Sequence, residues 1–278
     1  MKIGQVEVGG GSHVKVMGII NVSPESFYKG SVRVGATEIA EAAREMQEAG
    51  AHIIDIGAMS TAPYLETMIP AKEEIRRMTE ALLAAKSACS LPVSVDTPRA
   101  EVAGAAAKAG ADAINDVTGL KYDRKMTKVV AKAGLPVIAG AYSSAPARGN
   151  VAGTLKALKE TIAIAKKAGI SDVIVDPSIG FFRGEGKNPF FTKMTDLPWY
   201  ARDLQVLSNI DKIARLAPVC VSVSRKSFIG HLLNLEAKKC LVPSIACEIV
   251  AVINGASVIR THSAKETVQA LAMLELLR

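Results

Sequence analysis

The sequence is poor in aromatic side chains, which make up 4% of its 278 residues and include a single Trp. Proteins that hold single-stranded nucleic acid combine a basic groove with stacking aromatic rings. The chain carries a formal net charge of +7, but its 34 Lys and Arg residues form no dense run. We therefore expect no nucleic-acid partner, and we assign most of the charge to solvated surface.

Paired cysteines and long hydrophobic runs are also missing. No two of the four cysteines have C-x-x-C spacing, so we predict neither a zinc site nor a redox motif but free thiols in a reducing compartment. No stretch approaches the ~18 apolar residues of a membrane span, and the first residues are Gly-rich where a signal peptide needs an apolar segment. We expect a cytoplasmic protein with no membrane partner.

The chain contains one pattern that repeats along its length. A short apolar run is followed by an Ala/Glu/Lys-rich helical segment, then by a Gly, then by the next run. The runs resemble parallel strands covered on both faces, because they are continuously apolar. The predicted strands are Val14–Val22, His52–Ile56, Pro92–Val95, Ala113–Asn115, Leu135–Ala141, Val173–Val175, Val219–Val223 and Ser257–Arg260.

The helical segments lie between these runs, and Gly50, Gly110, Gly134, Gly169 and Gly255 follow five of them, where a left-handed cap is expected. The predicted helices are Ala36–Glu48, Ala71–Ser87, Arg99–Lys108, Lys125–Ala133, Thr154–Lys167, Leu197–Leu216, a stretch from Ser227 to Asn254, and Ala264–Leu277. Eight such units predict an α/β fold with a single (β/α)8 TIM barrel domain over residues 1–278, with Met1–Ser12 as a short cap over the barrel bottom. An open doubly wound sheet is the alternative, but neither a G-x-G-x-x-G nor a P-loop is present.

Seven of the eight predicted strands end in an ionisable or amide side chain. In this barrel the carboxyl ends of the strands meet at one mouth, where active sites lie. Taken singly, an Asp or Asn after a strand can also cap a helix or form a turn. The strand-end residues are Asn21, Asp55, Asp96, Asn115 with Asp116, Asp176, Ser224-Arg225-Lys226, and Arg260-Thr261-His262.

The strand-end residues divide into two chemical groups. Asp96, Asn115, Asp176 and Lys226 combine acceptors and donors that suit a flat heterocycle bearing N–H and C=O groups. Asn21, Arg260 and His262 suit a phosphate or diphosphate, with Mg²⁺ as a companion, and Arg225 and Lys226 place two cations beside a strand end. The pattern alone predicts a barrel enzyme acting on a polar heterocycle and an anion.

Seven ordered motifs then become specific, and they cover essentially the whole chain. They are Met17–Phe27 (MGIINVSPESF), Asp55–Pro63 (DIGAMSTAP), Ser94-Val-Asp96-Thr97, Ile114-Asn115-Asp116-Val117, Asp176–Phe181 (DPSIGF), Ser224–Gly230 (SRKSFIG) and Ile259–His262 (IRTH). In this order they resemble the signatures of the dihydropteroate synthase family of pterin-binding TIM barrels.

The resemblance implies a transferase of folate or methanopterin biosynthesis. A 6-hydroxymethyl-7,8-dihydropterin diphosphate would lose pyrophosphate as an arylamine nitrogen attacks its methylene carbon. By resemblance, Asp96, Asn115, Asp176 and Lys226 would hold the pterin, with Gly180 and Phe181 lining its pocket. Asn21, Arg260 and His262 would bind the diphosphate, with Mg²⁺ near Asn21. Asp55 would also belong to the substrate-binding set, and Ser227 would lie near the arylamine.

The sequence departs from the family pattern around the second substrate. The family's Ser-Thr-Arg-Pro reads Ser-Thr-Ala-Pro here, with Ala62 in place of an Arg that helps bind an anionic group. The first loop continues Tyr28-Lys29-Gly30-Ser31, and Gly140–Ser144 replaces the usual His-Met segment after the fifth strand. The amine could therefore be p-aminobenzoate or a larger ribofuranosyl-aminobenzene phosphate, whose anionic phosphate the added Lys29 would suit.

Two other functions fit parts of the pattern. A methyltetrahydropterin-dependent corrinoid methyltransferase shares the Asp and Asn contacts to a pterin, but Arg260, His262 and the Ser-Arg-Lys-Ser motif argue against it. A non-catalytic pterin-binding protein is favoured only by Ala62 and the altered loops. By resemblance, we expect a homodimer that pairs through the last helices, around Ser244–Asn254 and Ala264–Leu277.

Overall fold

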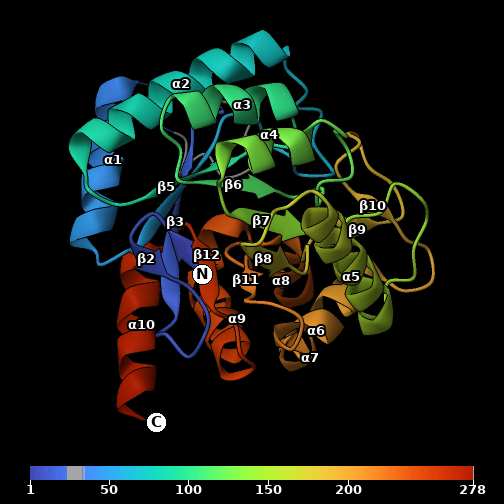
Figure 1. Cartoon of the computed structure of the whole chain (residues 1–278). Helices are drawn as coiled ribbons and strands as arrows, with labels where there is room; N and C mark the ends of the chain where they lie inside the picture. Colours follow the sequence, from blue (N-terminus) through green and yellow to red (C-terminus); the bar gives the residue numbers. More distant parts are fainter. Residues whose placement is uncertain (24–32, 34, 278) are drawn as a thin grey trace.

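Eight parallel strands form a closed barrel, as predicted (Figure 1). The computed structural model describes residues 1–23, 33 and 35–277. The strand order is β11-β12-β3-β4-β5-β6-β7-β8, and pairing of Val175 with Val219 joins the last strand to the first. The barrel strands are β3 (Lys15–Asn21), β4 (Ile53–Gly57), β5 (Val93–Asp96), β6 (Ala113–Asp116), β7 (Val137–Gly140), β8 (Val173–Asp176), β11 (Cys220–Val221) and β12 (Val258–Thr261).

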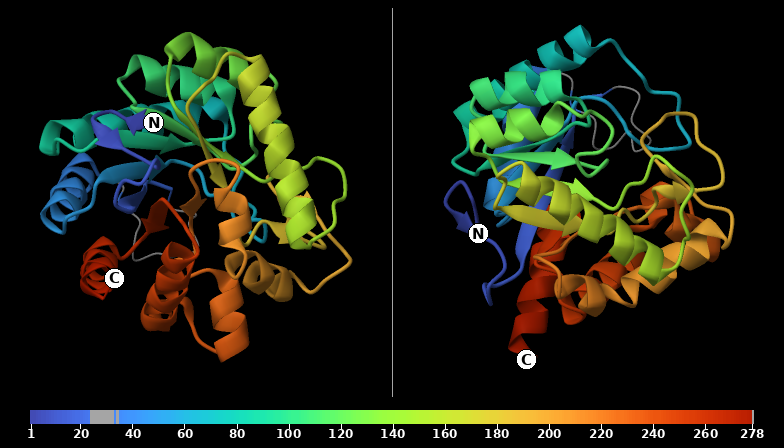
Figure 2. Two further views of the ribbon diagram at one scale, coloured as in Figure 1. Left: turned by 60° about the horizontal axis from the view of Figure 1, so that its bottom comes forward. Right: turned by 45° about the vertical axis from the view of Figure 1, so that its right-hand side comes forward.

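Helices surround the strands on the outside of the barrel (Figure 2). They are α1 (Ala36–Glu48), α2 (Ala71–Ala88), α3 (Ala100–Lys108), α4 (Met126–Ala133), α5 (Val151–Lys167), α6 (Trp199–Leu207), α7 (Ile210–Ala214), α8 (Ser227–Leu233), α9 (Leu241–Ile253) and α10 (Ala264–Leu276). Two predicted segments differ. Ser208 and Asn209 divide Leu197–Leu216 into two helices, and Asn234, in the left-handed conformation at φ 51°, ends α8 well before α9 begins.

The predicted glycine positions close their helices in the expected conformation. Gly50, Gly110, Gly134, Gly169 and Gly255 all have positive φ, between 66° and 99°. A side chain at such a φ would bring its Cβ close to the following carbonyl. These residues therefore let the chain turn sharply from each helix into the next strand.

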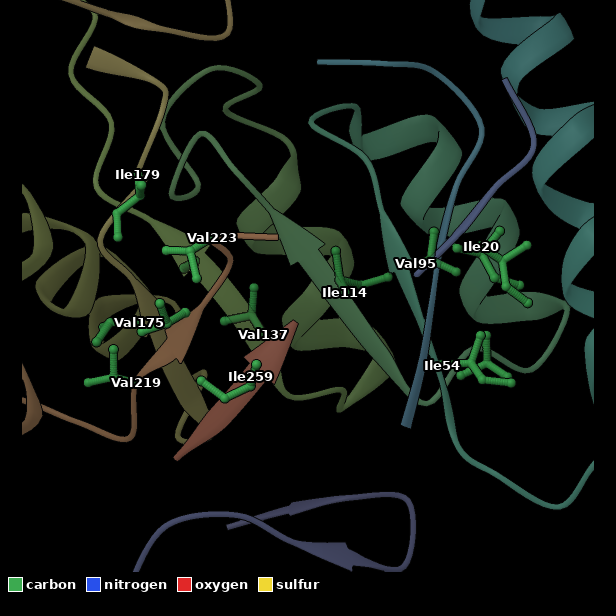
Figure 3. Packing of buried hydrophobic residues seen from close by; sticks show 14 of the residues in the cluster. Ile20, Ile54, Val95, Ile114, Val137, Val175, Ile179, Val219, Val223 and Ile259 are labelled. Carbon is green, nitrogen blue, oxygen red and sulfur yellow. The ribbon is translucent and has the colours of Figure 1, made fainter. Parts of the chain in front are cut away.

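Alternation along each strand sorts the side chains into two layers. Ile54, Val95 and Ile114 point outward and pack with the helices in one large apolar cluster (Figure 3). Their neighbours in sequence point into the barrel instead, because successive side chains of a strand face opposite sides. Close to the strand ends, these inward positions carry Asp55, Asp96 and Asn115, so the fold itself delivers polar groups to the mouth.

The first residues close the opposite end of the barrel, as predicted. β1 (Lys2–Ile3) and β2 (Val6–Glu7) form an antiparallel hairpin beneath the strands (Figure 3). Ile3 and Val8 are buried, and they pack against inward-facing side chains at the start of the strands. These side chains are Met17, Ile53, Ala113, Ile138, Ile174, Cys220 and Val258. The barrel bottom is thus filled by apolar side chains, and the polar mouth is the end open to ligands.

All four cysteines are free thiols, and Cys220 and Cys240 are buried. Within the described part of the chain, no helix is both long enough and apolar enough to cross a membrane. Two short strands outside the barrel, β9 (Phe182–Arg183) and β10 (Thr192–Lys193), pair in the connection between β8 and α6 and were not predicted.

Candidate active site

A cavity that is open to solvent occupies the mouth of the barrel. It brings together residues that are as much as 241 positions apart in the sequence. All but one of the predicted site residues line it: Asn21, Asp96, Asn115, Asp176, Gly180, Phe181, Lys226, Ser227, Arg260 and His262. The same wall also includes Ala62, where the sequence departs from its family pattern.

Asp55 is the one predicted residue that does not line the cavity. Its side chain is fully buried beneath the mouth, where Oδ2 accepts hydrogen bonds from Arg260 Nε at 2.6 Å and Asn115 Nδ2 at 3.1 Å. Arg260 also donates from Nη2 to Asp96 Oδ2 at 2.8 Å. Asp55 therefore anchors Arg260 and Asn115 from below, and it presents no group to the cavity itself.

Asp96 combines a charged partner with a vacant acceptor. Its Oδ2 receives Arg260, whereas its buried Oδ1 has no hydrogen-bond partner among the described residues. Burial raises the pKa of Asp96 to about 7, against the opposing effect of Arg260 and with the help of the nearby Asp55. A buried acceptor without a partner is costly, so this oxygen is suited to receive an N–H from a ligand.

Asp176 and Lys226 also line the cavity. Burial raises the pKa of Asp176, although Ser178 N donates to its Oδ1 at 2.6 Å. Burial lowers the pKa of Lys226 to about 8, against the opposing effect of Asp176. The Lys226 ammonium also lies over the Phe181 ring, 4.5 Å from its centre, in a cation–π contact.

Gly180 is required beside Lys226 for two reasons. Its φ is 88°, and a Cβ there would come within 3.3 Å of Lys226 Cδ. Gly180 N donates to Asp203 Oδ1 at 3.0 Å. Because a side chain at this position would be strained and would press on Lys226, the glycine keeps the wall of the cavity flat.

A buried ion pair on α6 supports the turn that carries Asp176 to Phe181. Arg202 and Asp203 are both fully buried, with Nη1 to Oδ1 at 3.0 Å. Arg202 also donates to the carbonyl oxygens of Pro177 at 2.6 Å and Ser178 at 3.0 Å. Sequence reasoning missed this pair, because its partners are backbone atoms of a turn more than 20 residues away.

The residues predicted to bind an anion lie where β3 and β12 end. His262 Nδ1 is 3.3 Å from Ser224 Oγ, and burial with the nearby cations Arg260, Arg225 and Lys226 lowers the pKa of His262 to about 3. His262 is therefore neutral at pH 7 in the ligand-free protein. Asn21 and Gly57, at the ends of β3 and β4, both line the cavity. The Asn21 amide oxygen lies beside Gly57, 3.5 Å from the position that a Cβ on this glycine would take.

Metal ligands are scarce here. Over residues 1–23, 33 and 35–277, no cluster of three or more His, Cys, Asp or Glu side chains is arranged to hold an ion. Mg²⁺ prefers oxygen ligands and usually keeps substrate phosphates and water in its shell. The Asn21 amide oxygen fits such an ion only when an anionic ligand brings most of the other oxygens.

Two further cations, Arg225 and Lys29, were expected to face an anionic group. The guanidinium of Arg225 donates to the carbonyl oxygens of Ala237 and Lys238 and to Ser263 Oγ. Its φ is 55°, in the left-handed region, and its neighbour Lys226 lines the cavity. Arg225 therefore does not line the cavity, although its charge acts there by helping to lower the pKa of His262. Lys29 and the loop around it lie outside the described residues.

Comparison with known proteins agrees with this geometry. Residues 17–262 match the model of the family described as pterin binding enzyme. The dihydropteroate synthase of Clostridium beijerinckii is 34% identical over 282 residues, covering 100% of this chain and 99% of that protein.

Solved structures give the same answer. Dihydropteroate synthase from Coxiella burnetii, in complex with pteroic acid, superposes with a TM-score of 0.83 at 33% identity, covering 96% of this chain and 94% of that one. The Xanthomonas albilineans enzyme with 4-aminobenzoic acid has a TM-score of 0.80 at 31% identity, covering 95% and 93%. With family, relatives and barrel in agreement, the chain belongs to the pterin-binding enzymes and is a transferase of the dihydropteroate synthase type.

Proposed function

We propose that the cavity condenses 6-hydroxymethyl-7,8-dihydropterin diphosphate with an arylamine and releases pyrophosphate, as a step of folate synthesis. The observation that carries the proposal is the vacant, buried Oδ1 of Asp96. A pterin presents a guanidine-like edge of N–H donors, and such an edge pairs with carboxylates. The neighbour structures with pteroic acid and 4-aminobenzoic acid support the same substrate classes.

The pterin ring would lie between the two acidic sides of the cavity. Asp96 and Asp176 would accept ring N–H groups, while Asn115 and Lys226 would donate to ring nitrogen and carbonyl acceptors. Asp96 has a pKa of about 7 and Lys226 of about 8 in the ligand-free state. A ligand that pairs with both replaces the lost water and favours their charged forms.

The diphosphate would occupy the side of Arg260, His262 and Asn21. Arg260 donates hydrogen bonds from Nε to Asp55 and from Nη2 to Asp96. Among the described residues its Nη1 has no acceptor. This nitrogen would be left for a phosphate oxygen. His262 would take up a proton or donate one N–H as the anion arrives, because a nearby negative charge raises the pKa of an imidazole.

Mg²⁺ fits the proposal as an ion carried by the diphosphate, with Asn21 as its protein ligand. When bound, it would neutralise charge on the departing pyrophosphate. Arg260 would stabilise the same charge from the protein side. The arylamine nitrogen forms a bond to the methylene carbon, the bond from that carbon to the diphosphate oxygen breaks, and the amine proton passes to water. No side chain becomes a covalent nucleophile.

A pyrophosphate-release assay tests the proposal. The purified protein would be given the pterin diphosphate with Mg²⁺ and, in separate reactions, p-aminobenzoate, the ribofuranosyl-aminobenzene phosphate, or no amine. We expect amine-dependent release that EDTA abolishes. Pterin binding without release would indicate a binding protein, and binding of a methylpterin independent of Mg²⁺ would indicate a methyltransferase.

Two variants tie the activity to the cavity. Asp96→Ala should weaken pterin binding by ~2–5 kcal/mol, or about 30-fold to several thousand-fold, because the partners of the carboxylate stay buried without it. Lys226→Ala should also lose affinity and activity. Asp211→Ala, which removes a half-exposed carboxylate on α7, is the matched control. Full activity of Lys226→Ala would show that the site is wrongly assigned.

The last helices support a homodimer, which we propose as the solution state. α9 and α10 pack against each other and expose several large apolar side chains. These are Val242, Val250, Ile253, Met273 and Leu276. Light scattering should give twice the chain mass of 29.2 kDa, and Ile253→Glu combined with Leu276→Glu should reduce the mass to that of one chain.

A further inference from the structure

One part of the cavity wall lacks the cation that the family pattern places there. Ala62, Pro63 and Tyr64 line this part together with Ser227. Ala62 replaces the arginine that the family pattern places there, so this loop brings no guanidinium to an anionic arylamine. A carboxylate bound in a half-enclosed cavity without a cation or a strong donor would pay its desolvation without compensation.

The segment that contains β9 and β10 packs against this altered loop. Asn188 Nδ2 donates to the carbonyl oxygens of Ala62 at 2.7 Å and Leu65 at 3.3 Å. Lys187 N donates to Pro63 O at 2.7 Å. The connection between β8 and α6 therefore fixes the loop around Ala62, and it also carries a cation, Arg183, at its start.

Arg183 lies directly behind the cavity wall. Its Nη2 donates to Ser227 Oγ at 2.7 Å and its Nε to Gly180 O at 3.1 Å, and the guanidinium stacks 3.6 Å from the centre of the Trp199 ring. Its side chain is buried, with 8% of the residue exposed. Among the described residues no carboxylate forms an ion pair with it. The nearby carboxylate of Asp203 opposes the lowering of the Arg183 pKa by burial, but that carboxylate is already paired with Arg202 at 3.0 Å. A buried cation whose neighbouring carboxylate is shared in this way still favours a further anion nearby.

Arg183 determines what Ser227 can offer to a ligand. A hydroxyl has one O–H donor and accepts hydrogen bonds through its lone pairs. Since Ser227 Oγ already accepts from a cation, its own proton is left for an acceptor in the cavity, and the positive charge strengthens that donation. Ser227 lines the cavity whereas Arg183 does not.

We propose that Arg183 is a positioning residue that acts through Ser227 to select an arylamine carrying a carboxylate, in place of the cation missing at Ala62. This inference rests on the proposed function, because it names the group that recognises the second substrate. It predicts that the carboxylate of p-aminobenzoate accepts the Ser227 hydroxyl and gains the charge of Arg183 behind it.

The test compares p-aminobenzoate with its neutral amide, p-aminobenzamide, in wild type and variants. In Arg183→Met, which keeps an apolar chain over Trp199, the ratio of kcat/KM for acid over amide should fall at least tenfold. Arg183→Lys should recover part of the ratio. KM for the pterin diphosphate should stay within twofold. Lys187→Ala removes an exposed charge from the same segment while keeping its backbone bond, and should leave the ratio unchanged.

The ratio within one preparation does not depend on how much protein is folded, so a stability loss cannot imitate the result. Ser227→Ala should lower the ratio by a similar factor, and the double variant should lower it little further, because the two residues act as one unit. An unchanged ratio in Arg183→Met, or fully additive effects, would overturn the inference.

Two outcomes separate this inference from the proposed function. No pyrophosphate release by wild type with any arylamine refutes the function itself, whereas equal turnover of acid and amide refutes only the role of Arg183. If Arg183→Met turns over neither amine, a wild-type crystal structure with p-aminobenzoate decides. The carboxylate within hydrogen-bond distance of Ser227 Oγ supports the inference, and a carboxylate bound elsewhere contradicts it.

Discussion

At the bottom of the barrel seven strands begin with apolar side chains that face inward, whereas at the mouth the same barrel ends in charged and amide groups. The bottom is closed by Ile3 and Val8 and contributes stability through burial. The mouth holds Asp55, Asp96 and Arg260 within one hydrogen-bonded group. One end of the fold is thus built for stability, and the other retains costly polar groups for a ligand.

The largest effect is expected from a polar pair near the mouth that contributes to stability, as the apolar side chains of the bottom do. Arg202→Ala should lower the free energy of unfolding by about 3–5 kcal/mol, since it leaves Asp203 as a buried charge without its partner. Urea denaturation measures the change. Arg215→Ala removes an arginine whose side chain is 79% exposed and should change the value by less than about 0.5 kcal/mol. A loss below 1 kcal/mol in Arg202→Ala would show that the pair does not hold the turn.

A substitution at the bottom should affect stability alone. Ile3→Ala removes a fully buried side chain from the plug and should cost about 2–5 kcal/mol in the same assay. At a temperature where the variant is folded, its KM for the pterin diphosphate should equal that of wild type. Lys2→Ala, beside it and exposed, is the control. A changed KM would mean that the two ends are coupled.

The effect that is smallest per step of its measurement is a pH dependence that belongs to the mouth. The unfolded chain releases the Asp96 proton near pH 3.9, but the folded protein releases it near the raised pKa of about 7. Between these values the folded state binds more protons, so the free energy of unfolding should fall as pH rises, by at most about 1.4 kcal/mol per pH unit.

Asp96→Asn should remove this part of the slope. The measurement is urea denaturation of wild type and variant, both ligand-free, at several pH values from 4 to 8. His262 contributes with the opposite sign below pH 6.5, since its pKa is lowered, but it is present in both proteins and cancels in their difference. A difference that does not vary with pH would show that Asp96 is ionised throughout.

The fold was predictable because its signals are local. Apolar runs, helical segments and closing glycines such as Gly134 each depend on neighbours in sequence, and all eight barrel strands lie where the runs predicted them. β9 and β10 were missed because each has only two residues and their pairing depends on the loop that they cover.

The sequence predicted which residues line the cavity, but it did not predict which of their side chains pair with one another. Strand ends meet at one mouth by topology, so Asn21, Asp96, Asp176 and Arg260 could be gathered from sequence. The ion pair that covers Asp55 with Arg260 could not be predicted, because the two residues are 205 positions apart and no sequence pattern reports which side chains pair inside the barrel. Arg183 was not singled out by a motif, and its importance follows only from the hydrogen bond that it donates to the Ser227 hydroxyl in the structure.

The pairing of Val175 with Val219 has a consequence for motion. It forms the seam of the barrel, where the last strand meets the first. Asp176 stands on one side of this seam and Lys226 follows the strand on the other side. A heterocycle that hydrogen-bonds to both side chains would link the two strands across this seam. Substrate binding should therefore slow amide hydrogen exchange along β8 and β11 more than along β4 and β5.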